Sequence, residues 1–226
     1  NGLKELHIDM AQVEGIFISH EHSDHIAGLQ QLLKRFDIPV YTKQGTWREI
    51  QDKLVVPKNQ LIELTKGSLT LGNLIVEPFA VSHDAADPIG INVFSGKDKA
   101  TVVTDTGIIS DDILHRIDDS TLLVLEANYD PHMLRFGPYQ PFLKQRVASD
   151  EGHLSNEMAA QALLMMKRPD FMQVILAHRS ENNNNAVLVT QTIGKMLVDG
   201  GVRIGPEMKL QHGQPNEIVS MQSIKR

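Results

Sequence analysis

Short apolar runs alternate along this chain with segments in which apolar residues recur at helical spacing. Runs of strand length occupy 13–19, 39–42, 60–64, 73–81, 121–127 and 172–177. Helical spacing connects Ile26, Leu29, Leu32, Leu33 and Phe36, and it is also found at 44–54 and 186–198. The pattern predicts strands that alternate with helices.

Turn and cap signals divide these elements. Gly96-Lys97-Asp98 separates two strand-like runs at 91–95 and 100–104, which predicts a hairpin. Ser110 and Ser155 stand where helices would begin, and both are expected N-caps. Strands that alternate with helices, some of them paired by tight turns, predict an α/β (α+β) fold with a mixed sheet system covered by helices. With no internal repeat or linker, we expect a single domain over 1–226.

Composition narrows the class of protein. The 226 residues are 41% hydrophobic and 22% charged, which is typical of a globular chain. There is no cysteine, so disulfides, thiolate zinc sites and cysteine nucleophiles are excluded. No apolar run approaches the length of a membrane span, and we expect a cytoplasmic protein without a membrane partner. The net charge of −6 disfavours nucleic-acid binding by charge alone, unless bound cations reverse the local sign.

The densest chemistry lies in F-I-S-H-E-H-S-D-H, from Phe17 to His25. Imidazole nitrogens and carboxylate oxygens together suit zinc, manganese or iron. His20 and His22 lie two residues apart after a strand and would point the same way, whereas Asp24 and His25 fall where a helix begins. The segment therefore predicts ligands for two neighbouring ions; the alternative is a polar loop that is rich in histidine.

H-E-H-S-D-H resembles the H-x-H-x-D-H signature of metallo-β-lactamase-fold hydrolases. The resemblance implies an αββα sandwich and two divalent cations, zinc or manganese with iron as a further possibility. It also implies three later ligands at strand ends. His83 would join His20 and His22 on one ion, His178 would join Asp24 and His25 on the other, and Asp105 would bridge both.

Enzymes with this fold catalyse several different reactions, so other segments must indicate which group of them the chain resembles. L-E-A-N-Y-D, with Glu126, and G-H-L-S-N, with His153, resemble the ribonuclease Z-like enzymes, in which such a pair protonates the leaving group. Together with S-H-D-A-A-D-P and H-R-S-E-N-N they resemble, over essentially the whole chain, the WalJ (YycJ) group of bacterial metallohydrolases, members of which are nucleases.

The implied function is a dinuclear-metal-dependent hydrolase that cleaves phosphodiester bonds of nucleic acid, as an exonuclease, through a metal-bridging hydroxide. Asp24 would accept the water's proton, and His153, held by Glu126, would protonate the leaving oxygen. The expected partner is a nucleic-acid substrate, DNA in preference to RNA; the oligomeric state stays open. Two alternatives remain: a glyoxalase II-like hydrolase of small thioesters or esters, and a non-catalytic binding protein stabilised by metal.

Two features depart from the group. Its members generally begin with a strand pair upstream of the position of Asn1, so we expect the fold to lack those N-terminal strands here. Arg179 stands where leucine is usual; we interpret it as a surface charge, with a phosphate contact as the alternative. The other cations form no evident stripe, no aromatic stacking array is evident, and 182–185 reads as a polar loop whose amides could touch substrate.

Overall fold

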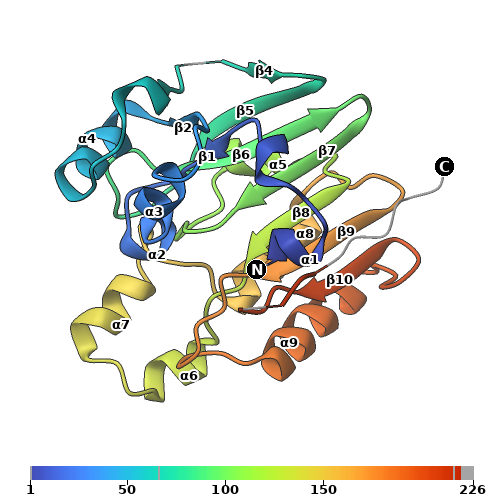
Figure 1. The fold of residues 1–226 in the computed structure, drawn as a ribbon. Helices are drawn as coiled ribbons and strands as arrows, with labels where there is room; N and C mark the ends of the chain where they lie inside the picture. Colours follow the sequence, from blue (N-terminus) through green and yellow to red (C-terminus); the bar gives the residue numbers. More distant parts are fainter. Residues whose placement is uncertain (1, 66, 216, 220–226) are drawn as a thin grey trace.

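The computed structural model describes residues 2–65, 67–215 and 217–219, and it contains two sheets (Figure 1). The smaller sheet is parallel, in the order β1-β2-β3, and consists of β1 (Ile16–Phe17), β2 (Val40–Thr42) and β3 (Leu61–Glu63). The larger is mixed, in the order β10-β9-β8-β7-β6-β5-β4. Its strands are β4 (Leu69–Leu71), β5 (Leu74–Ala80), β6 (Ile89–Ser95), β7 (Asp98–Val103), β8 (Leu122–Glu126), β9 (Met172–Ala177) and β10 (Met208–His212).

Helices cover both sheets. The N-terminal part contains α1 (Gly2–Glu5), α2 (Ser23–Ile26), α3 (Leu29–Leu33) and α4 (Gln44–Lys53). The remainder contains α5 (Asp111–Ile117), α6 (Pro131–Phe136), α7 (Pro141–Val147), α8 (Asn156–Met165) and α9 (Ala186–Asp199). Figure 1 shows α6 and α7 projecting from the body of the fold.

Three apolar clusters hold the layers together. One joins α2, α3 and α4 to the small sheet through residues such as Leu29, Val40 and Trp47. A second lies between the sheets, where Tyr41 and Leu64 meet Ile89. The largest packs α5, α8 and α9 against the other face of the large sheet. The outcome is an α/β fold with mixed sheets, in which helices lie outside and the sheets face each other.

Most of the predicted elements are present. The hairpin forms between β6 and β7, and Ser110 and Ser155 accept hydrogen bonds from the amides of Ile113 and Met158, both at 3.2 Å. The strand predicted at 13–19 is reduced to the two residues of β1. The helix predicted beyond it is divided into α2 and α3. The sequence patterns did not predict α6, α7, β4 or β10.

Parallel pairing from β7 to β10 determines where the chemistry gathers. Val103 pairs with Leu125, and Glu126 pairs with Ala177, so β7, β8 and β9 finish side by side. The residues that follow these strands therefore meet at one edge of the sheet, where α/β proteins commonly place their sites. Within the described ranges, no helix is long and apolar enough to cross a bilayer.

Candidate metal centre

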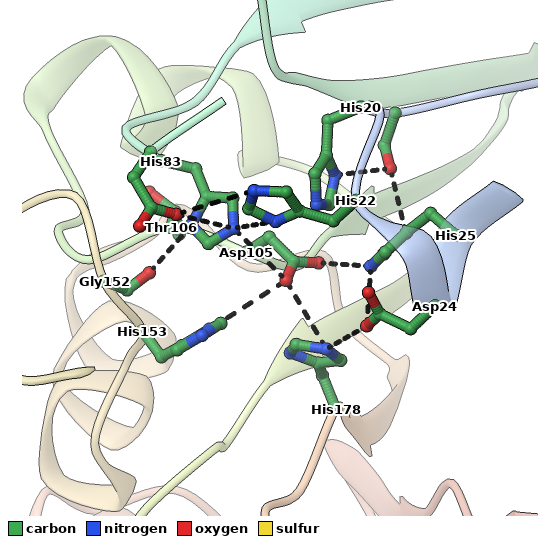
Figure 2. Close-up of polar contacts among 12 residues, drawn as sticks. His20, His22, Asp24, His25, His83, Asp105, Thr106, Gly152, His153 and His178 are labelled. Carbon is green, nitrogen blue, oxygen red and sulfur yellow. Dashed lines mark hydrogen bonds and ion pairs between the residues drawn. The ribbon is translucent and has the colours of Figure 1, made fainter. Parts of the chain in front are cut away.

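The histidine-rich segment leaves β1 and turns into α2. The hydroxyl of Ser19 lies 3.1 Å from Nδ1 of His20 and 3.2 Å from Nδ1 of His25, so it orients both rings. The His20 ring centroid lies 4.6 Å from that of His22 and 4.0 Å from that of His25. Figure 2 shows these rings converging on one space rather than facing solvent as a polar loop would.

Side chains from three distant strand ends complete this space. Nε2 of His83 lies 3.3 Å from Nδ1 of His22 and 3.8 Å from Oδ1 of Asp105. Oδ2 of Asp105 lies 3.5 Å from Nε2 of His25, and its Oδ1 lies 3.4 Å from Nε2 of His178. Asp105 therefore lies between the two halves of the cluster (Figure 2).

The ligand-type atoms form four overlapping groups, each with its atoms within 4.8 Å of one another. The groups are His20, His22 and His83; Asp24, His25 and His178; His20, His25 and Asp105; and Asp105, Glu126, His153 and His178. All seven residues singled out in the sequence belong to these groups. Two of the groups correspond to the two sets of three that the resemblance implies, while the roles of these residues as ligands stay a prediction.

The residues present fit divalent cations. Nε2 of His20 and Oδ2 of Asp105 are buried and have no hydrogen-bond partner. Such atoms are costly in a folded protein unless something else binds them, and a cation does so. Asp105 and His178 also adopt left-handed backbone conformations, with φ of 57° and 52°. Non-glycine residues rarely adopt this region, and such strain is typical of functional sites.

Burial and neighbouring histidines favour the neutral form of two imidazoles, His20 and His83, and the neutral form is the one that binds metal. Burial, followed by the neighbouring His25 and His83, lowers the pKa of His20 to about 2. Burial also lowers the pKa of His83. His178 differs: burial lowers its pKa, but the hydrogen bond and charge of Glu126 outweigh burial and raise the pKa of His178 to about 9.

Glu126, at the end of β8, accepts hydrogen bonds from two of the histidines. Its Oε1 accepts hydrogen bonds from Nδ1 of His178 at 2.6 Å and Nδ1 of His153 at 2.8 Å. Its Oε2 accepts from the amides of Thr106 and Leu154, both at 3.2 Å. Burial raises the pKa of Glu126, yet these two histidines lower it to about 2. A fully buried carboxylate with these partners positions other groups and cannot itself touch a substrate.

Two residues that the sequence patterns did not single out also belong to the site. Oδ1 of Asp84 lies 3.5 Å from Nε2 of His83, is buried and lacks a hydrogen-bond partner, while Oδ2 accepts a hydrogen bond from Arg146. Asn128 donates to the carbonyl of His178 at 2.8 Å. Asp84 lies in S-H-D-A-A-D-P, directly after His83, and Asn128 lies in E-A-N-Y-D, two residues after Glu126. Their closeness in sequence to these two site residues is the only signal in the sequence that could have identified them.

The asparagine side chains at 182–185 make different contacts. Asn184 is buried and donates to the carbonyls of Ala127 and Asn128 at 3.0 and 3.2 Å, so it holds strand-end loops together. Asn185 caps α9 by accepting from the amide of Leu188 at 2.9 Å. Asn182, Asn184 and Asn185 all line the cleft beside the site.

A cleft of about 900 Å³ opens beside the histidine cluster. Tyr139 and Arg146 line it together with His153, His178 and Arg179. Nη1 of Arg179 is buried and has no hydrogen-bond partner. The expectation of a simple surface charge is therefore wrong for Arg179: half-buried, it borders a cleft that begins at the site, where an anion would satisfy it.

Mixed sheets between helices, with histidine and aspartate clusters at the strand ends, define a metal-dependent hydrolase. The chain belongs to the metallo-β-lactamase superfamily: a family described as "Beta-lactamase superfamily domain" matches residues 3–178. It is 34% identical over 223 residues to "Exodeoxyribonuclease YycJ" of Bacillus anthracis, covering 98% of this chain and 84% of that protein. It is 30% identical over 227 residues to "Exodeoxyribonuclease WalJ" of Streptococcus pneumoniae, with the same coverage. The fold resembles the structure of YhfI from Bacillus subtilis, with a TM-score of 0.65 and 16% identity over 87% of this chain and 74% of that one.

Proposed function

We propose that this protein is a two-metal phosphodiesterase that cleaves nucleic acid as an exonuclease, with DNA as its substrate. The observation that carries the proposal is the position of His153. Its ring is fixed through Nδ1 by Glu126, and the same atom lies 3.9 Å from Oδ1 of Asp105. An imidazole held beside a metal centre, but outside the seven proposed ligands, suits proton transfer to a leaving alkoxide.

The proposed ligands divide between two cations, zinc or manganese, as the groups above suggest. His20, His22 and His83 would hold one, and Asp24, His25 and His178 the other, with Asp105 shared. Two such cations, when bound, supply Lewis acidity toward a phosphoryl oxygen and make a nucleophile available near neutral pH.

Side chains of the protein carry out the proton transfers and orient the substrate. Nδ1 of His153 donates to Glu126, so Nε2 is the atom that gives a proton to the departing sugar oxygen. Asp24 is largely exposed, and its carboxylate accepts the proton of the attacking water. Arg146 and Arg179, which line the cleft, would orient the phosphates that flank the scissile bond.

Two further considerations support DNA and cleavage from an end. The relatives from Bacillus anthracis and Streptococcus pneumoniae are named as exodeoxyribonucleases, and this chain matches them over 98% of its length. The cleft, of about 900 Å³, lies in the upper part of the range of ligand pockets, roughly 300–1,000 Å³, and so has room for the terminal nucleotide of a strand beside the site.

The test is a panel of labelled single-stranded and double-stranded DNA and RNA, linear and circular, with zinc, manganese or magnesium. We expect linear DNA to be degraded and circular DNA to be spared. Asp24→Ala and His153→Ala should each remove most of the activity. If the metal-loaded protein cleaves none of these substrates but hydrolyses an acyl thioester, with His153→Ala unaffected, the proposal fails in favour of a small-molecule thioesterase.

A further inference from the structure

The exposed aromatic side chains gather in one place. Among the aromatic residues that the structure describes, only Phe136 and Phe142 are exposed, at 67% and 72%. Phe136 ends α6 and Phe142 lies in the first turn of α7. We call residues 131–147, which comprise both helices and their connection, the α6–α7 hairpin. Two phenylalanines that face water on one short hairpin indicate a surface with a binding role.

Neither phenylalanine is needed to hold the hairpin in place. Its own small core consists of Leu134 and Val147 packed on Tyr129, with Tyr139 and Leu143 against them. Asp130 caps α6 by accepting a hydrogen bond from the amide of Met133 at 2.8 Å. The fold therefore accounts for the buried side of the hairpin and leaves Phe136 and Phe142 without a structural function.

The charge of the hairpin is opposite to that of the whole protein. Residues 131–147 contain Arg135, Lys144 and Arg146 and no aspartate or glutamate, in a chain with a net charge of −6. The guanidinium of Arg135 lies 5.3 Å from the ring centroid of Phe136, and Lys144 donates to the carbonyl of Arg135 at 2.8 Å. One cation, Arg135, therefore lies directly beside an exposed ring, and a second, Lys144, contacts the backbone of that arginine.

The hairpin also leads into the site. Tyr139, Leu143 and Arg146 line the cleft in which His153 and His178 lie. In Figure 1, α6 and α7 lie at the end of the molecule where β8 and β9 finish. A ligand that rests on the hairpin can therefore continue into the cleft without crossing the rest of the protein.

We propose that the α6–α7 hairpin is a binding surface for an unpaired nucleic-acid strand, which stacks bases on Phe136 and Phe142 and threads its end into the cleft. This rests on the proposed function. Exposed rings interleaved with cations match a polyanion whose bases have free π-faces. A duplex hides those faces, and a two-fold contact with a second copy would bring cations against cations.

The test measures binding of a fluorescent oligothymidine and of a duplex of equal length to the metal-loaded protein, in the His153→Gln background so that cleavage is slow. We expect Phe136→Ala and Phe142→Ala each to weaken single-strand binding about tenfold, and to change duplex binding much less. Phe142→Trp should retain affinity, whereas Phe142→Leu, which stays apolar but loses the ring, should not. Val187→Ala and Val198→Ala, on α9 with 63% and 59% exposure, are matched controls and should change nothing.

The outcomes separate this proposal from the proposed function. Hydrolysis of bis(p-nitrophenyl) phosphate, which is too small to reach the hairpin, reports the metal centre alone and should be unchanged in the phenylalanine variants. If wild type cleaves DNA but the double variant Phe136→Ala/Phe142→Ala binds the strand as tightly, the hairpin proposal is wrong. The proposal is also wrong if the double variant binds the strand normally but no longer self-associates, which would assign the surface to a second copy. It is equally wrong if the double variant binds the strand normally but no longer binds anionic vesicles, which would assign the surface to lipid.

Discussion

Nδ1 of His153 lies 2.8 Å from Oε1 of Glu126, and that same oxygen accepts a hydrogen bond from Nδ1 of His178 at 2.6 Å. One buried carboxylate therefore orients a proposed metal ligand and a proposed acid together. In both rings the Nδ1 proton is directed at Glu126; in His178 this leaves Nε2 3.4 Å from Oδ1 of Asp105, and in His153 it leaves Nε2 outside the bond to Glu126. This arrangement couples the position of the proton donor to the position of the metal centre.

His153→Gln should slow DNA cleavage by a factor of about 10²–10⁴, because the leaving sugar oxygen needs a proton. It should slow hydrolysis of bis(p-nitrophenyl) phosphate far less, since p-nitrophenolate leaves without one. Steady-state rates on both substrates check this, and bound metal measured by mass spectrometry should equal that of wild type. Equal losses on the two substrates, or a loss of metal, would show that His153 is not the acid.

Asp105→Asn should reduce the amount of metal retained after dialysis, because Asp105 lies within 3.8 Å of His25, His83 and His178. A ligand at 100 times its dissociation constant stabilises a protein by about 2.7 kcal/mol. We therefore expect the melting temperature of the variant to approach that of wild type in EDTA. Asp112→Asn, in the first turn of α5, is the control and should retain full metal content. Wild-type melting that does not respond to EDTA would contradict a metal-stabilised site.

Much of the site could be predicted from the sequence because its signals are local. Three histidines and an aspartate lie within 20–25, and His83, Asp105 and His178 follow strand-like runs in the expected order. Strand periodicity places such residues at a sheet edge, and only the pairing of β7, β8 and β9 had to be supplied by the fold. The hairpin at β6–β7 and the caps at Ser110 and Ser155 were likewise predictable from short-range chemistry.

Other features of the site and surface depend on contacts between residues far apart in the sequence, which no local sequence pattern reveals. Asp84 follows His83 in the chain, but its contact with Arg146 joins residues 62 apart. Phenylalanine is usually a core residue, so the sequence does not indicate that Phe136 and Phe142 are exposed. They are exposed because Leu134 and Val147 form the core of the hairpin in their place. Arg179 resembles a surface charge in sequence, yet the loop after β9 turns it toward the cleft.

The metal-free protein should lose stability on both sides of a defined pH window because of the Glu126–His178 pair. The pKa of His178 is raised from 6.5 to about 9, so its contribution is complete below 6.5 and disappears as the pH rises through 9. The pKa of Glu126 is lowered from 4.5 to about 2, so its contribution is present above 4.5 and disappears as the pH falls toward 2.

Urea unfolding in EDTA from pH 3 to pH 10, for wild type and Glu126→Gln, checks this window. The difference in unfolding free energy should be largest between 4.5 and 6.5 and should shrink on either side. His20, whose low pKa destabilises the protein in acid, titrates in both proteins, so its effect cancels in the difference. A pH-independent difference would show that Glu126 acts only through packing.

Arg179→Leu should weaken DNA binding at low salt and reduce the slope of log affinity against log salt by about one, because one phosphate contact is lost. Its buried, unpartnered Nη1 and its place in the cleft are the reasons. Arg179→Lys should keep the slope but not the full affinity, since an ammonium cannot reproduce the planar guanidinium fork. Arg203→Leu, whose arginine pairs with Glu207 in a different cavity, is the control and should leave both quantities unchanged. A salt slope that Arg179→Leu does not alter would place the phosphate path elsewhere on the protein.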